Sequence, residues 1–107
     1  MISEDRLSKA LAYLASTDAE AAALKVDVER KHYVLKRTKA AVYLMSTGTV
    51  PEREAQSITS NEYKDAEQAY LDAYLASEAM ANKRKSEELV TKIWQSLNAN
   101  RRAGNIT

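Results

Sequence analysis

Residues that interrupt regular backbone structure are almost absent from this chain. Its 107 residues include two glycines and one proline, at Gly48, Gly104 and Pro51. Residues 1–47 and 52–103 contain neither type, although average usage would place about a dozen in a chain of this length. β-Sandwiches and β-barrels need them for tight turns and positive φ, and a phosphate-binding loop needs several glycines. The chain is therefore predicted to be all-α.

Composition limits how such a chain is stabilised. One domain over residues 1–107 is expected at this length. The chain has 18 alanines, no phenylalanine and no cysteine. A disulfide or thiolate metal site is therefore excluded, and no cofactor, metal or small-molecule substrate is expected. A small hydrophobic core that no disulfide reinforces favours a homo-oligomer. Neither a signal peptide nor a run of 18 apolar residues is recognisable, so we expect a cytoplasmic location and no membrane partner.

Capping signals divide the chain into four expected helices. Three threonine–glutamate pairs have capping-box spacing, in which a hydroxyl and a carboxylate satisfy free amides at a helix start. Gly48 and Gly104 are expected to end the long helices, and Pro51 suits a first turn. The boxes are Thr17/Glu20, Thr49/Glu52 and Thr59/Glu62. The expected segments are a short N-terminal helix over 1–16, a long helix over 18–47, a connecting helix over 50–58 and a long helix over 60–103.

The long segments are well above the mean helix length of about 11–12 residues, which is typical of a coiled-coil-like antiparallel hairpin. The first has heptad-spaced apolar residues, although Lys31 and Thr38 weaken one row. The last has two apolar stripes, which predicts two packing partners: the other long helix, and either the N-terminal helix or another subunit. The candidate oligomer or partner interface comprises Tyr63, Tyr70, Leu71, Tyr74, Leu75, Ile93, Trp94 and Leu97.

Charge alternates in sign along the chain. Net charge is −2 over residues 1–24, +4 over 25–49, −5 over 50–78 and +4 over 79–107. Antiparallel folding about the 48–60 connection predicts that opposite signs meet along the long helices. Each exposed ion pair contributes only about 0–1 kcal/mol, so the pattern favours a register more than it stabilises the fold.

Cations interleaved with tyrosines form the strongest candidate binding surface. Cations follow phosphates and aromatic rings stack on bases, which is what single-stranded nucleic acid requires. The alternative is that the acidic stripe of the last helix neutralises these cations, and that the tyrosines are core residues with a solvated hydroxyl. The candidate nucleic-acid-binding residues are Arg30, Lys31, Tyr33, Lys36, Arg37, Lys39, Tyr43, Lys83, Arg84, Lys85, Arg101 and Arg102.

Catalytic chemistry finds little support in the sequence. His32 is the single histidine, has no recognisable triad partners, and is expected to face solvent on a helix. The carboxylate pairs Glu52/Glu54 and Glu87/Glu88 do not share a helix face. The chain is therefore expected not to be an enzyme.

A resemblance adds a functional expectation. The run Ser46-Thr-Gly-Thr-Val-Pro-Glu-Arg, the Tyr/Ala-rich helix after it, Trp94 and Asn98-Ala-Asn-Arg-Arg look like small helical proteins encoded by tailed phages. Over residues 17–105 the layout resembles phage recombination mediators, which are oligomeric and load a recombinase onto single-stranded DNA. The resemblance implies an accessory protein that binds single-stranded DNA or a recombination or replication protein. The alternative is an inhibitory or structural module that docks a host or phage protein through an apolar face.

Overall fold

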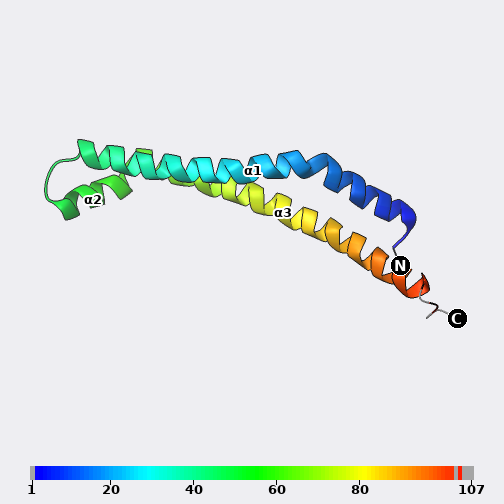
Figure 1. Ribbon diagram of the computed structural model, residues 1–107. Helices are drawn as coiled ribbons and strands as arrows, with labels where there is room; N and C mark the ends of the chain where they lie inside the picture. Colours follow the sequence, from blue (N-terminus) through cyan, green and yellow to red (C-terminus); the bar gives the residue numbers. More distant parts are fainter. Residues whose placement is uncertain (1, 103, 105–107) are drawn as a thin grey trace. The chain divides into compact units, whose positions relative to one another are not determined.

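The computed structural model describes residues 2–102 and 104, and they form three helices. These are α1 (Glu4–Met45), α2 (Val50–Thr59) and α3 (Asn61–Arg102) (Figure 1). The described part of the chain contains no β-strand. The all-α prediction is therefore confirmed, as is the short helix in the connection. The sequence left open whether the last helix is continuous through residues 82–88, and α3 is continuous there. No helix among the described residues is apolar enough over its length to cross a membrane.

The predicted separate N-terminal helix over 1–16 is wrong, because α1 continues without interruption from Glu4 to Met45. Ser16 and Thr17 do not cap a new helix. Their hydroxyls donate to the carbonyl of Tyr13 within the same helix, at 3.1 and 2.7 Å. Serine and threonine inside a helix commonly satisfy their hydroxyls in this way. Thr17 therefore resembles a capping residue only in its spacing from Glu20.

The connection between the long helices follows its sequence signals more closely. Thr49 is the N-cap of α2, and its hydroxyl accepts from the amide of Glu52 at 3.4 Å. Pro51 lies in the first turn, and Gly48 has a φ of 114°, which favours glycine. The third predicted box is displaced by one residue: the hydroxyl of Ser60, not that of Thr59, accepts from the amide at the start of α3. Gly104 also has positive φ, and the predicted helix end at Ala103 lies outside the described residues.

The chain divides into two compact units, and both long helices contribute to each. Unit 1 comprises residues 1–21 and 79–107. Within it, Arg6 contacts Glu87, and the Tyr13 hydroxyl donates to the sulfur of Met80 at 3.6 Å. Residues later in α1 thus meet residues earlier in α3, which is the order of antiparallel helices.

Unit 2 comprises residues 22–78 and contains α2, which lies beside the last turns of α1 (Figure 1). Ser57 is fully buried, and its hydroxyl donates to the carbonyl of Lys39 at 3.1 Å. Arg53 donates to the carbonyl of Tyr43 at 3.0 Å, and Gln56 to that of Thr47 at 2.9 Å. Backbone carbonyls near the end of α1 thus hold α2 in place.

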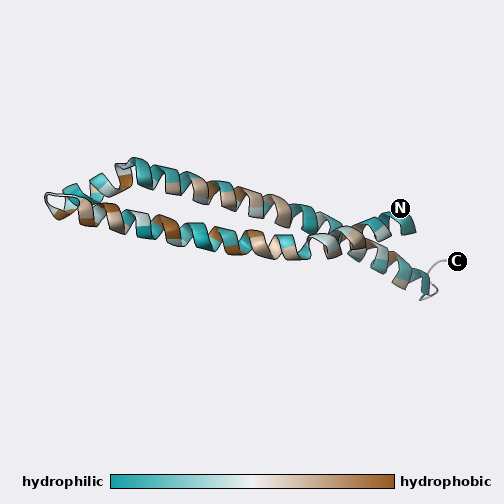
Figure 2. Ribbon diagram, turned by 90° about the horizontal axis from the view of Figure 1, so that it is seen from above, coloured by the Kyte–Doolittle hydropathy of each residue, from teal (hydrophilic) through white to brown (hydrophobic). Residues whose placement is uncertain are grey.

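Covered positions recur at heptad spacing along both long helices, but the core is thin. Among the described residues, Ala10, Ser57 and Ala73 are buried. The other positions along the line of contact between the helices (the seam) are half-buried. Figure 2 shows hydrophobic and hydrophilic residues interleaved along α1 and α3. As predicted, Lys31 and Thr38 place polar side chains in one of the two heptad rows of α1. Of the predicted heptad positions, Ala21, Leu24, Val28, Leu35 and Val42 in α1, and Tyr63, Ala66, Tyr70, Ala73 and Met80 in α3, lie on the covered side. Met45, predicted in the same heptad row as Leu24, is instead 86% exposed in the last turn of α1.

Candidate functional site

The predicted basic residues of α1 form an exposed surface in unit 2. We define the basic face as Arg30, Tyr33, Lys36, Arg37 and Lys39, all of which are exposed. At 100° per residue, the first four lie within about 120° of the helix circumference, and Lys39 lies about 60° beyond Lys36, next to the covered side of the helix. The Tyr33 side chain is 56% exposed, so its ring is available between the cations.

The predicted neutralisation of these cations by α3 is not found as ion pairs. Within residues 2–102, no carboxylate of α3 lies within 4.0 Å of a basic group of residues 30–39. Arg30 makes one long contact with Asp27 in its own helix, at 3.7 Å. Lys36, Arg37 and Lys39 make no ion pair in the described structure. Helical geometry explains this for Arg30, Lys36 and Arg37, because cations that point away from the covered side of α1 cannot reach acids on the neighbouring helix.

Two residues predicted for the nucleic-acid surface have other contacts. Lys31 is half-buried on the seam side and lies 3.7 Å from Asp27. Tyr43 is half-buried, and the guanidinium of Arg53 lies 4.4 Å from its ring centroid. Arg53, which sequence reasoning missed, thus binds both the ring and the carbonyl of Tyr43. These contacts fix α2 and separate Lys31 and Tyr43 from the basic face.

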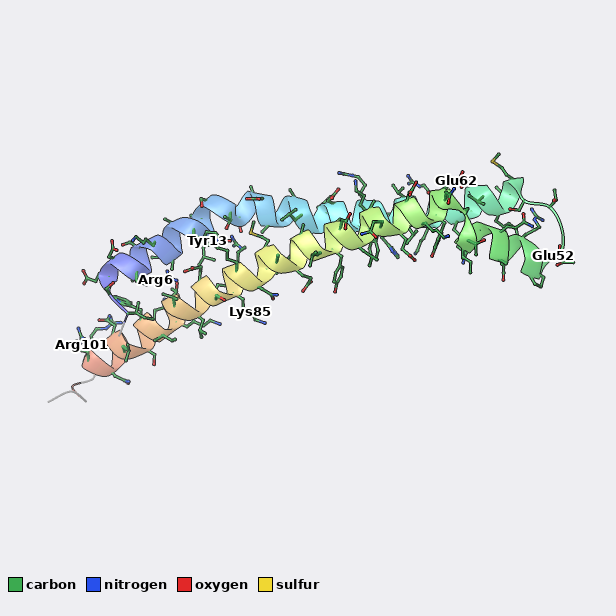
Figure 3. All side chains as sticks on the ribbon, turned by 180° about the vertical axis from the view of Figure 1, so that it is seen from behind. Arg6, Tyr13, Glu52, Glu62, Lys85 and Arg101 are labelled. Carbon is green, nitrogen blue, oxygen red and sulfur yellow. The ribbon has the colours of Figure 1, made fainter. Side chains whose placement is uncertain are left out.

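The predicted run Lys83-Arg84-Lys85 does not form one cationic surface. Arg84 donates to the Leu14 carbonyl at 2.8 Å and to the Thr17 hydroxyl at 2.7 Å, and its side chain is only 17% exposed. The ammonium of Lys83 lies 4.8 Å from the Tyr13 ring centroid. Lys85 is exposed and points away from α1, whereas Tyr13 points toward α3 (Figure 3). Consecutive residues point in different directions on a helix, so the run divides among three roles.

Arg84 also confirms part of the predicted charge matching. Its guanidinium lies 3.3 Å from the carboxylate of Asp18, which the alternating charges placed near this part of α3. The pairing is a contact between helices within unit 1. Arg84 therefore belongs to the fold and not to an exposed binding surface.

The C-terminal residues of α3 border a second exposed region in unit 1. Arg101 and Arg102 are exposed in the last described turn, where cations complement the helix dipole. Trp94 is half-buried. A small open hollow of about 140 Å³ is lined by Ile2, Glu4, Trp94, Leu97, Asn98 and Arg101.

The residues predicted for an oligomer interface separate into two groups. Tyr63, Tyr70 and Trp94 are half-buried on the covered side of α3, so they belong to the fold of the chain itself. The other five large side chains remain exposed on α3 outside the seam. Their exposed fractions are 51% for Leu71, 48% for Tyr74, 69% for Leu75, 42% for Ile93 and 41% for Leu97.

The expectation that His32 faces solvent is wrong. Its side chain is half-buried, and its ring centroid lies 5.4 Å from that of Tyr70 on α3. The heptad pattern contains the signal, because His32 directly follows the seam position Lys31 and precedes the seam position Leu35 by one turn. The imidazole therefore packs between α1 and α3 in unit 2.

An ion pair in unit 1 has no counterpart among the predicted sites. Arg6 and Glu87 lie 2.7 Å apart, and the Glu87 side chain is only 16% exposed (Arg6 is labelled in Figure 3). The hydrogen bond from Arg6 lowers the pKa of Glu87, and the charges of Arg6 and Lys83 act in the same direction against partial desolvation. The same bond raises the pKa of Arg6. The sequence indicates the Arg6–Glu87 pair only once the antiparallel register of α1 and α3 in unit 1 is known.

The described residues contain no group of three histidine, aspartate or glutamate side chains that could hold a metal ion. The basic face of α1 and the exposed apolar residues of α3 are two surfaces that could bind a ligand or partner. Comparison with known proteins found no matching family model, no matching curated protein and no matching solved structure.

Proposed function

We propose that this chain is a non-enzymatic accessory protein that binds single-stranded DNA as a homo-oligomer, in the cytoplasm of a bacterial cell infected by a tailed phage. The observation that carries the proposal is the basic face of α1, where Lys36, Arg37 and Lys39 are exposed without an ion pair among the described residues. The proposal includes one long antiparallel hairpin formed by α1 and α3, which stays a prediction.

The mechanism follows from the residue types on this face. Cations bind backbone phosphates and release their counterions, which gives affinity without sequence preference. Tyr33 lies among these cations and offers an exposed ring on which a base stacks. Self-association supports the function because it joins several short cationic tracks into a longer one and raises the effective concentration of each binding site.

A DNA titration at two salt concentrations tests the proposal. The triple variant K36A/R37A/K39A is expected to bind an oligonucleotide at least about tenfold more weakly at low salt. Its slope of log affinity against log salt should be smaller by about 2, because each phosphate contact on a single strand contributes about 0.7. The matched control K9A/K25A/K64A removes the same charge from exposed lysines outside the basic face and should stay close to wild type.

Two results contradict the proposal. Failure of the wild-type protein to bind at low salt removes DNA binding from its function. Equal losses in the two triple variants show that net charge, and not the basic face, determines the affinity.

A second candidate function is protein docking through the outer side of α3. Its supporting observation is that Leu71, Tyr74 and Leu75 are all about half exposed or more in unit 2. Large adjoining apolar side chains on a surface commonly mark interaction sites. A recombination, replication or host protein bound there should dissociate little as salt rises, whereas DNA bound to phosphate-contacting cations dissociates steeply.

A further inference from the structure

Four aromatic rings form a row across unit 2, from α1 to α3. The ring centroids of Tyr33 and His32 lie 6.4 Å apart, those of His32 and Tyr70 5.4 Å, and those of Tyr70 and Tyr74 6.3 Å. Each distance falls within the range of about 4.5–7 Å in which aromatic pairs attract one another. Tyr33 and Tyr74, at the two ends of the row, are 56% and 48% exposed. The row therefore offers accessible ring surface beside the basic face.

An open hollow lies against the α1 end of this row. Its volume is about 260 Å³, and all its lining residues belong to unit 2. Pockets for drug-sized ligands measure about 300–1,000 Å³, so this hollow suits a ligand no larger than one flat ring system. The lining residues are Val28, Glu29, His32, Tyr33 and Tyr70.

Ring contacts position the imidazole of His32 in this hollow. Its Nδ1 atom is covered and has no hydrogen-bond partner among the described residues. Most buried polar atoms in proteins do have such a partner. His32 instead has one tyrosine neighbour on each long helix, Tyr33 on α1 and Tyr70 on α3. The walls of the hollow are therefore mainly aromatic, which favours a ligand that stacks.

Glu29 supplies the charged group of the hollow. It is exposed and makes no ion pair in the described part of the chain. A carboxylate only accepts hydrogen bonds, and it suits the exocyclic amino group of a base such as cytosine. Thymine has a carbonyl oxygen at the same ring position, which would place two acceptors opposite each other. The carboxylate also repels phosphate, so it favours a base over the DNA backbone.

Lys36 places a cation at the edge of the same hollow. At 100° per residue, it lies about 40° from His32 and about 60° from Tyr33 around the helix, between the two. It follows them by four and three residues, a spacing at which side chains on a helix are neighbours. Lys36 is exposed. A phosphate can therefore bind Lys36 while the base of the same strand enters the hollow.

We infer that this hollow is a base-binding subsite for single-stranded DNA, selective for bases with an exocyclic amino group. Tyr33, His32 and Tyr70 contact the base, and Glu29 accepts a hydrogen bond from its amino group. The inference rests on the proposed DNA-binding function. It adds a base preference to an affinity that otherwise comes from phosphates.

Competition between two homopolymers tests the selectivity. Oligo(dC) and oligo(dT) of equal length have pyrimidines of similar size, and the wild type should bind oligo(dC) at least about fivefold more tightly at the same low salt. E29Q should reduce this preference to within about twofold, because an amide both donates and accepts. The matched control E54Q removes the same charge from an exposed glutamate of α2 and should keep the wild-type preference.

A second pair of variants tests the ring contacts. Y33L replaces the ring with an aliphatic side chain and should weaken binding to oligo(dC) at least about fivefold, because stacking on a base is lost. The slope of log affinity against log salt should not change, because no phosphate contact is removed. Y33F keeps the ring and should stay close to wild type. Tyr33 is exposed, and circular dichroism verifies that both variants remain helical.

The outcomes separate this inference from the DNA-binding proposal. Equal wild-type affinity for the two oligonucleotides overturns the subsite and leaves phosphate binding by the basic face intact. A preference that survives in E29Q, or that falls equally in E54Q, also overturns the subsite, as does wild-type affinity in Y33L. If the wild type binds neither oligonucleotide at low salt, the proposed function itself is overturned, and the subsite with it.

Discussion

Units 1 and 2 use their charged residues differently. In unit 1, Arg6 and Arg84 connect the two long helices, each with a carboxylate partner on the opposite helix. In unit 2, Lys36, Arg37 and Lys39 reach no carboxylate among the described residues. Cations with carboxylate partners thus join α1 to α3 in unit 1, whereas the cations of the basic face in unit 2 are exposed and Arg53 joins α2 to α1 through the carbonyl and ring of Tyr43.

The difference shows how a cation's position around the helix decides its role. Arg84 and Glu87 occupy the covered side of α3, where partial burial favours specific hydrogen bonds. Arg30, Tyr33, Lys36 and Arg37 of the basic face point away from the covered side of α1, where an exposed ion pair would contribute little. Cations on the covered side therefore support the fold, and those on the outer side are available to a ligand.

The largest expected effect concerns the polar core of unit 2. Replacing the buried Ser57 with leucine forces a larger side chain between α2 and α1 and removes the hydrogen bond to the Lys39 carbonyl. The free energy of unfolding should fall by about 2–4 kcal/mol, measured by urea denaturation. S8L places the same side chain at an exposed position in unit 1 and should have little effect. Equal losses would show that Ser57 has no special packing role.

A smaller effect is expected at the polar contacts of unit 1. R84A removes hydrogen bonds to the Leu14 carbonyl and the Thr17 hydroxyl, and the contact with Asp18. The free energy of unfolding should fall by about 1–2 kcal/mol. The control K83A removes the cation over Tyr13 and a charge near Glu87, and should cost about 0.5–1 kcal/mol. A larger loss for K83A contradicts the structural role assigned to Arg84.

The smallest effect is a pH dependence in unit 1. Arg6 holds the pKa of Glu87 below its ordinary value of 4.5, so the pair stabilises the folded state above this pH. This contribution is lost as pH falls through the lowered pKa, where Glu87 becomes protonated in the folded state. Between about pH 7 and about pH 3, the thermal midpoint of the wild type should therefore fall more steeply than that of E87Q.

The neighbouring carboxylate provides the control for that experiment. Glu88 is exposed and makes no ion pair within the described residues, so E88Q should follow the wild-type profile. If the profiles of E87Q and wild type coincide, the Arg6 contact contributes nothing measurable to stability.

Much of the helical fold follows from local sequence signals. Scarce glycine and proline predict the long helices, and Thr49, Pro51 and Gly48 mark the connection because each satisfies a local backbone requirement. The same local reasoning fails at Ser16 and Thr17. Their hydroxyls bond to a carbonyl of the preceding turn, and spacing alone does not distinguish that bond from a cap.

The candidate site was less predictable, because it depends on direction around the helix and on distant partners. Composition identifies the cations of residues 30–39, but only their placement separates the seam residue Lys31 from the exposed Lys36 and Arg37. Arg84 appears in the sequence as part of a basic run. Its structural role is apparent only in the folded chain, where it donates to three acceptors of α1. These acceptors lie 66–70 positions earlier in the sequence.

The fold-back of α2 has a consequence for the order in which the molecule assembles. Its hydrogen bonds to α1 join residues 10 and 18 positions apart, whereas the polar contacts between the helices of unit 1 join residues 66–81 positions apart. Short loops lose less entropy on closure. We therefore expect α2 to dock early and unit 1 to close last. Conversely, the ends of α1 and α3 in unit 1 should exchange their amide hydrogens first, because local opening begins where contacts are fewest.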